Sequence, residues 1–176
     1  METAKAHRNV SRRAALAMPF LLGGAGAGAQ VLPPPGGRVV LDVAGSFRAS
    51  GATSPARFDL AMLDGLPQQG FSTRTPWFDG PRHFRGVAGA ALMSLLDPAG
   101  AEVRATALND YRVTIPAEDF RSAGLVIATR LDDQPIPVRE KGPLWIVYPF
   151  DSDARLRNEV FYGRSIWQLR RLAFPG

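Results

Sequence analysis

The chain has 176 residues, of which 45% are hydrophobic and 21% are charged, a composition typical of one globular domain. It contains no cysteine, which excludes disulfides, thiolate metal sites and a lipoprotein anchor. The formal net charge is +5, but the sequence has no block of basic residues, so nothing in it indicates nucleic-acid binding.

Residues 1–29 are predicted to be a cleavable export signal. Basic residues precede an apolar run at 14–22, and small residues follow that run. Two overlapping Ala-x-Ala patterns end at Ala27 and Ala29, so we expect cleavage after one of them and a periplasmic location. The apolar stretch is too short, and too interrupted by Pro19 and glycines, to favour a membrane-spanning helix.

The export route has two interpretations. Arg12 and Arg13 follow Ser11, which resembles a twin-arginine signal, although Ala15 stands where phenylalanine is usual. The alternative is that the paired arginines are ordinary positive charge for the general secretory route. Removal of the signal leaves 17 basic and 15 acidic residues, a net charge of +2, so most of the positive charge belongs to the signal.

The first half of the domain contains predicted strands and short helices. Residues 30–37 include three consecutive prolines and are predicted to form an extended tether before a single domain at 38–176. The residue pattern then predicts strands at 39–43 and 56–60, a short helical turn at 61–66 and a helix at 86–96.

The second half is predicted to consist mainly of short strands. Strands at 102–108 and 111–115 flank Asn109-Asp110, a pair suited to a hairpin turn, and a short helix follows at 116–120. Further strands are predicted at 125–131, 144–148 and 166–174. Many short strands with few short helices and no βαβ alternation indicate a β-rich α+β fold with mixed sheets.

Common catalytic signatures are absent from the sequence, which has no glycine-rich phosphate loop, no His-Glu-x-x-His and no Gly-x-Ser-x-Gly. His83 is interpreted as a lone exposed loop histidine, with a Ser-His-Asp relay as the open alternative. The carboxylate pairs Asp132-Asp133 and Asp151-x-Asp153 fall at predicted turns, where aspartate accepts local backbone hydrogen bonds, so we interpret them as structural.

Three groups of motifs occur in a fixed order along residues 58–174. The first comprises 73–77 and 84–87 with the helix up to Leu96, and the second comprises 109–111 with 114–116. The third comprises 133–137, 142–144, Val147-x-Pro149 and 166–169. Their order and spacing resemble the molybdopterin-binding domain of the sulfite-oxidase family. The resemblance implies a sulfite-oxidase-type molybdopterin-binding fold, a molybdopterin cofactor and oxidoreductase activity.

One departure from the family pattern concerns the metal. In the family, a cysteine four residues before the first tryptophan binds molybdenum, and that position here is Thr73. A neutral hydroxyl is a much poorer ligand for such a metal than a thiolate. We therefore expect no protein ligand to a metal and assign no catalytic residue.

The resemblance also implies a set of cofactor-binding residues in or beside the motifs. Cations there suit phosphate or carboxylate, and Trp77 and Tyr111 are suited to an aromatic wall. The competing interpretation makes Trp77, Trp145 and Trp167 core residues and leaves the arginines solvated or paired with acids. The predicted cofactor-binding set is Thr73, Arg74, Trp77, Asn109, Asp110, Tyr111, Arg139, Lys141 and Arg164.

Two functions follow as hypotheses. The first is an exported oxidoreductase-like domain that holds a pterin cofactor, molybdopterin, without a cysteine metal ligand. The second is a non-catalytic periplasmic ligand-binding or sensor module on the same fold. Expected partners are a small anionic ligand or a pterin, together with a membrane-bound partner protein, whereas nucleic acid is not expected. Fold alone does not choose between them, because function depends on the site.

Overall fold

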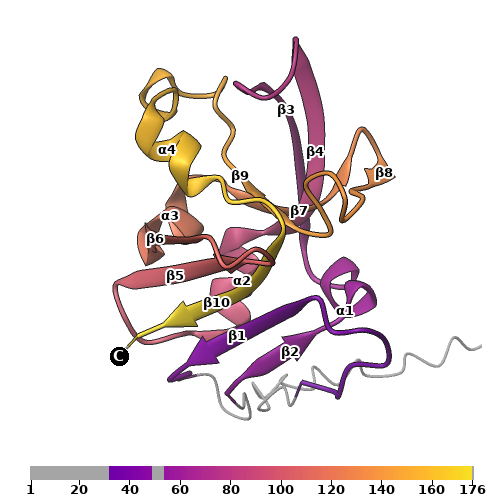
Figure 1. The fold of residues 1–176 in the computed structure, drawn as a ribbon. Coiled ribbons are helices and arrows are strands. Elements are labelled where there is room, and N and C mark those ends of the chain that lie inside the picture. Colours follow the sequence, from indigo (N-terminus) through magenta and orange to yellow (C-terminus); the bar gives the residue numbers. More distant parts are fainter. Residues whose placement is uncertain (1–31, 49–53, 176) are drawn as a thin grey trace, which may run out of the picture.

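The computed structural model describes residues 32–48 and 54–175 (Figure 1). The predicted export signal, residues 1–29, lies outside these residues, and of the predicted tether only residues 32–37 are described. Across the described ranges, no helix combines the length and the apolar character that crossing a membrane requires.

One five-stranded sheet forms the lower layer of Figure 1, in the order β2-β1-β10-β5-β6. β1 pairs with β10 in parallel, and the other neighbours are antiparallel. The first strand, β1, thus lies beside the last strand, β10. The strands are β1 (Leu41–Gly45), β2 (Ala56–Phe58), β5 (Glu102–Ala107), β6 (Arg112–Pro116) and β10 (Leu169–Phe174).

The second sheet is antiparallel, and its long β3–β4 hairpin rises above the first sheet in Figure 1. β4 lies between β3 and β7, and the other edge of β7 pairs with both β8 and β9. Its strands are β3 (Gln68–Arg74), β4 (Pro81–Ala88), β7 (Val126–Leu131), β8 (Gln134–Pro135) and β9 (Trp145–Val147).

Short helices connect the strands, and side-chain caps begin three of them, including the cap of η1 by Asp153. Asp59 accepts a hydrogen bond from the Met62 N–H at 2.8 Å and another from the Gly37 N–H at 2.7 Å, so it joins the end of the tether to α1. Asn158 accepts from the Val160 N–H at 2.9 Å and begins α4. The helices are α1 (Leu60–Asp64), α2 (Gly89–Leu96), α3 (Ala117–Ser122), η1 (a 3₁₀ turn, Ala154–Leu156) and α4 (Glu159–Arg164).

The core includes the first four residues of β7 and all of β9, which are buried on both faces. Residues 125–128 and 144–148 have no exposed side-chain surface. Both segments are continuous apolar runs, as expected for strands that are covered on both sides. The β-rich α+β prediction with mixed sheets is therefore confirmed.

The predicted helix at 86–96 was wrong at its start. Residues 86–88 end β4, and the helix begins at Gly89. Gly86 pairs with Ala128 of β7, and a Cβ at Gly86 would lie 2.1 Å from the Ile127 carbonyl oxygen. The apolar residues here have helical spacing, but pairing with β7 holds residues 86–88 in a strand. Gly142 of the third motif group shows the same close approach, since a Cβ there would lie 1.9 Å from the Ile136 carbonyl oxygen.

The predicted turns were correct. Asn109 Oδ1 accepts from the Tyr111 N–H at 3.1 Å, and Asp110 has φ 65°. Asp132 and Asp133 have φ 48° and 62° between β7 and β8, a left-handed backbone that aspartate tolerates. The polar strand β3 and helix α4 were not predicted.

The segment 165–169 links the two sheets. The Ile146 N–H donates to the Ile166 carbonyl at 3.0 Å, and the Leu169 N–H donates to the Leu144 carbonyl at 2.9 Å, so the segment runs beside β9. It then enters β10 in the other sheet. Side chains from this segment therefore lie where the two sheets meet.

Candidate functional site

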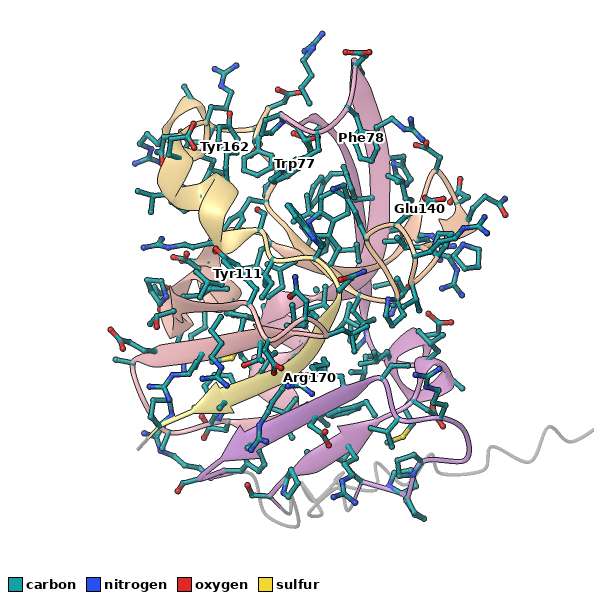
Figure 2. All side chains as sticks on the ribbon, in the orientation of Figure 1. Trp77, Phe78, Tyr111, Glu140, Tyr162 and Arg170 are labelled. Atoms are coloured by element: carbon teal, nitrogen blue, oxygen red, sulfur yellow. The ribbon has the colours of Figure 1, made fainter. Side chains whose placement is uncertain are left out.

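A cavity of about 470 Å³ lies between α4, the β5–β6 turn and the segment that follows β3. Its aromatic lining residues are Trp77, Tyr111, Tyr162 and Trp167. Figure 2 labels three of them, which come from three separate parts of the chain. The polar lining residues are Asn109, Glu159 and Ser165. Mostly apolar walls with a few polar groups are typical of small-molecule sites.

A cluster of aromatic rings supports the cavity. The Trp77 ring centroid lies 5.3 Å from that of Trp145 and 5.7 Å from that of Trp167. Trp145 is fully buried, and its Nε1–H donates to the Ser165 carbonyl at 3.1 Å. The core interpretation therefore holds for Trp145, whereas Trp77 and Trp167 are half-buried and line the cavity.

The charge of the cavity lining is negative. Glu159 is the single charged residue of the lining, which contains neither lysine nor arginine. Glu159 is exposed at the first position of α4, and none of the ion pairs in residues 32–48 and 54–175 involves it. The site thus presents ring faces and one carboxylate to a ligand.

Three of the predicted site residues, Trp77, Asn109 and Tyr111, meet at this cavity. Their neighbour Asp110 does not line it, and its carboxylate forms an ion pair with Arg170. These residues come from the first and second motif groups, which the fold brings together.

Thr73 and Arg74 lie at the end of β3, where they bind the loop after β9. Thr73 is fully buried, and its Oγ1 accepts from the Asp151 N–H at 2.9 Å. The Arg74 N–H donates to Asp151 Oδ2 at 2.9 Å, and its guanidinium lies 3.6 Å from the same oxygen. The Thr73 hydroxyl is thus engaged with the backbone, and Asp151 has a structural role, although its carboxylate binds a backbone N–H distant in the sequence and not a local one as predicted.

Arg164 lies at the end of α4 and is held away from the cavity by Asp119. Its Nη1 donates to Asp119 Oδ2 at 3.0 Å, and the Tyr148 hydroxyl donates to the same oxygen at 2.8 Å. Burial, and secondarily the Asp119 charge, raise the pKa of Tyr148, so this phenol stays protonated. The three side chains form one supporting network beneath α4.

Lys141 and Arg139 both lie outside the cavity lining. The Lys141 Nζ is 4.0 Å from the Trp167 ring centroid and 5.3 Å from that of Trp145, and burial lowers the pKa of this lysine. Lys141 does not line the cavity, and Arg139 is exposed in the preceding turn. The structure therefore does not gather the four predicted cations around one ligand.

The interpretation of His83 as a loop residue was wrong. It lies in β4, half-buried, and its Nδ1 is 3.3 Å from the Ser72 Oγ. Asp132 accepts from the His83 backbone N–H at 2.9 Å and pairs with Arg82. Because the carboxylate binds the backbone instead of the ring, these contacts differ from those of a catalytic relay.

The donor set does not fit a molybdenum centre. The position of the family cysteine holds a buried, hydrogen-bonded threonine hydroxyl. Within the part of the chain that the structure describes, no group of three or more histidine, cysteine, aspartate or glutamate side chains is placed to hold a metal ion.

Sequence reasoning missed Glu159 and Tyr162. Both lie on α4, three residues apart, which places them on the same face of the helix. A local signal for this helix exists, because Asn158 is a favoured N-cap residue and Glu159 is an acid in the first turn. Trp167 was included in the motifs but not in the predicted cofactor-binding set, and only the competing interpretation assigned it a role, as a core residue.

Comparisons with known proteins give a similarity of fold. No protein-family model matches the chain, and no curated protein sequence matches it. Among solved structures, it is similar to the sulfane dehydrogenase SoxCD from Paracoccus pantotrophus, with a TM-score of 0.55 and 15% identity. The match covers 76% of this chain and 37% of that chain. At this identity the similarity shows the fold, and it confirms the predicted sulfite-oxidase-type fold class.

Proposed function

We propose that this protein is an exported, non-catalytic domain that binds a small molecule in the cavity beside α4. The observation that carries the proposal is the aromatic-walled cavity of about 470 Å³ with a few polar groups in its lining. The lining contains no histidine, cysteine or lysine, and the Ser165 hydroxyl already donates to the Phe161 carbonyl at 2.9 Å, so it is not activated by a neighbouring base. Its composition favours binding over catalysis.

Export is part of the same proposal and depends on residues 1–29. Cleavage after Ala27 or Ala29 leaves a proline-rich tether before the domain. A periplasmic domain of this kind serves as a ligand-binding or sensor module for a membrane-bound partner protein.

A second candidate function is a molybdopterin-dependent oxidoreductase, which the similarity to a sulfane dehydrogenase favours. Two features of this chain weigh against it. Thr73 supplies no thiolate, and its hydroxyl is already bonded to Asp151. Cationic side chains favour the phosphate of a pterin cofactor, whereas the single charge in the cavity lining is that of Glu159.

Metal and pterin analysis separates the two candidates. The protein is purified from the periplasm of molybdenum-replete cells, and molybdenum is measured by mass spectrometry together with the absorption spectrum. We expect neither molybdenum nor pterin in stoichiometric amount, and the same result for a Thr73→Cys variant. Stoichiometric molybdenum or pterin in the wild-type protein overturns the binding-domain proposal in favour of the oxidoreductase.

A further inference from the structure

We infer that the cavity binds an organic cation of the alkylated ammonium class, held by aromatic ring faces and by the Glu159 carboxylate. The inference rests on the proposed function, because it names the class of ligand for the same cavity. It differs from the expectation of a small anionic ligand, which came from the cations near the motifs.

The ring geometry is the first argument. The Trp77 ring lies at 79° to Tyr162 and at 80° to Trp167, with centroids 6.2 Å and 5.7 Å apart. These edge-to-face contacts hold Trp77, Tyr162 and Trp167 together in the cavity lining, and Tyr111, which is 51% exposed, adds a fourth aromatic side chain. Ring faces carry partial negative charge, so an aromatic lining of this kind attracts an alkylated ammonium group.

The charge of the lining is the second argument. A cation in the cavity meets the ring faces and the Glu159 carboxylate together, whereas an anion is repelled by both. Two nearby arginines are neutralised outside the cavity, because Arg164 pairs with Asp119 and Arg170 pairs with Asp110. No lining residue pairs with Glu159, so its carboxylate is available to a cationic ligand.

Lys141 is the third argument, because it shows that this aromatic cluster attracts a cation within the chain itself. Its ammonium lies over the Trp167 ring at 4.0 Å from the centroid, yet Lys141 does not line the cavity. Because Lys141 already lies over the Trp167 ring, this ring attracts a ligand cation less strongly. We therefore expect Trp77, Tyr111 and Tyr162 to contribute more to ligand binding than Trp167.

A carbohydrate is the main competing ligand. Sugars also stack on aromatic rings, but each hydroxyl group requires a hydrogen-bonding partner. The cavity offers the polar side chains of Asn109, Glu159 and Ser165 and the hydroxyls of Tyr111 and Tyr162, but its only charge is negative and its ring planes lie at steep angles to one another. This lining favours a compact charged group over a polyhydroxylated ring.

The test compares choline with 3,3-dimethylbutan-1-ol, a neutral molecule of the same shape, and with glucose. Binding to the full mature chain is measured by tryptophan fluorescence and by calorimetry. We expect saturable binding of choline, and binding of the neutral isostere about tenfold weaker or more, because only choline gains the cation–π attraction. Glucose is expected to bind more weakly than choline.

Variants separate the two sources of attraction. Glu159→Gln keeps the shape of the side chain and is expected to weaken choline binding about fivefold and to reduce its salt dependence. Glu140→Gln is the matched control, because Glu140 lies in another part of the molecule (Figure 2) and does not line the cavity. Tyr111→Ala is expected to weaken choline binding about fivefold, whereas Tyr111→Phe, which keeps the ring, changes it less than twofold.

Each outcome decides one of the two proposals. Equal affinities for choline and its neutral isostere, tighter binding of glucose, or a Glu159→Gln variant with wild-type affinity for choline overturns the cationic ligand and leaves the binding cavity intact. No binding of choline also overturns it. Stoichiometric molybdenum or pterin in the purified protein overturns the proposed function itself, whatever choline does.

Discussion

The two faces of α4 differ in how their charges are satisfied. On one face, the Phe161 ring packs 5.1 Å from the Tyr148 ring, and Arg164 binds Asp119. On the other face, Tyr162 and Glu159 line the cavity, and the carboxylate has no ion-pair partner among the described residues. One face is anchored, and the other is open to a ligand.

The short length of α4 explains why one of its faces must be anchored. Six residues are too few for a helix that is stable without tertiary contacts. Anchoring one face through Phe161 and Arg164 supplies those contacts. On the open face, Tyr162 also packs against Phe150, with ring centroids 5.1 Å apart, whereas Glu159 is exposed and forms no ion pair among the described residues, so this carboxylate is available for binding.

The largest expected effect comes from breaking the anchored face with Asp119→Ala. The change leaves Arg164 and the buried Tyr148 hydroxyl without their shared acceptor, so we expect a loss of about 3 kcal/mol in the free energy of unfolding, measured by urea denaturation. Glu118→Ala, at an exposed neighbouring position, is the control and is expected to change it by less than about 0.5 kcal/mol. Similar losses for both variants would show that Asp119 does not anchor α4.

A smaller effect is expected for Tyr148→Phe. This variant removes the hydrogen bond at 2.8 Å to Asp119 but keeps the ring packing and the Arg164 pair. A hydrogen bond to a charged group contributes about 1.5 kcal/mol, which is the expected loss in urea denaturation. A loss as large as that of Asp119→Ala would mean that the ring packing, and not the hydroxyl, is disturbed.

The same hydroxyl predicts a dependence on alkaline pH. Because the pKa of Tyr148 is raised above its ordinary value of 10.0, the folded state binds this proton more tightly than the unfolded state does. Its stabilising contribution is therefore complete below pH 10 and is lost progressively above it, by at most about 1.4 kcal/mol per pH unit. Thermal unfolding between pH 9 and pH 11 measures the slope, which should be shallower in Tyr148→Phe. Parallel slopes in the two proteins would contradict the assignment.

The smallest expected effect on stability belongs to the open face. Glu159→Gln removes a favourable charge at the start of α4, so we expect a loss of no more than about 0.5 kcal/mol. Its choline affinity should fall nonetheless, as proposed above. A loss of stability comparable to that of Asp119→Ala would remove the distinction between the two faces.

Local features were predictable where a few neighbouring residues determine the backbone. Asn109-Asp110 and Asp132-Asp133 form turns because Asn109 accepts a local hydrogen bond and the aspartates tolerate positive φ. Residues 125–129 and 144–148 contain strands that are buried on both faces. The helix predicted from Gly86 failed because pairing with β7, distant in the sequence, decides that segment.

The sequence by itself determined the turns, most of the strands and the fold class, because each depends on a signal carried by adjacent residues or by the order of the motifs. Only the tertiary structure decided the site. It brings Trp77, Tyr111, Glu159 and Tyr162 together from separate elements, and it pairs Arg164 with Asp119 outside the cavity. The physical reason is that the charge of a binding site depends on which charged groups form ion pairs with one another. Strand pairing and helix packing determine which of these groups lie close enough to pair.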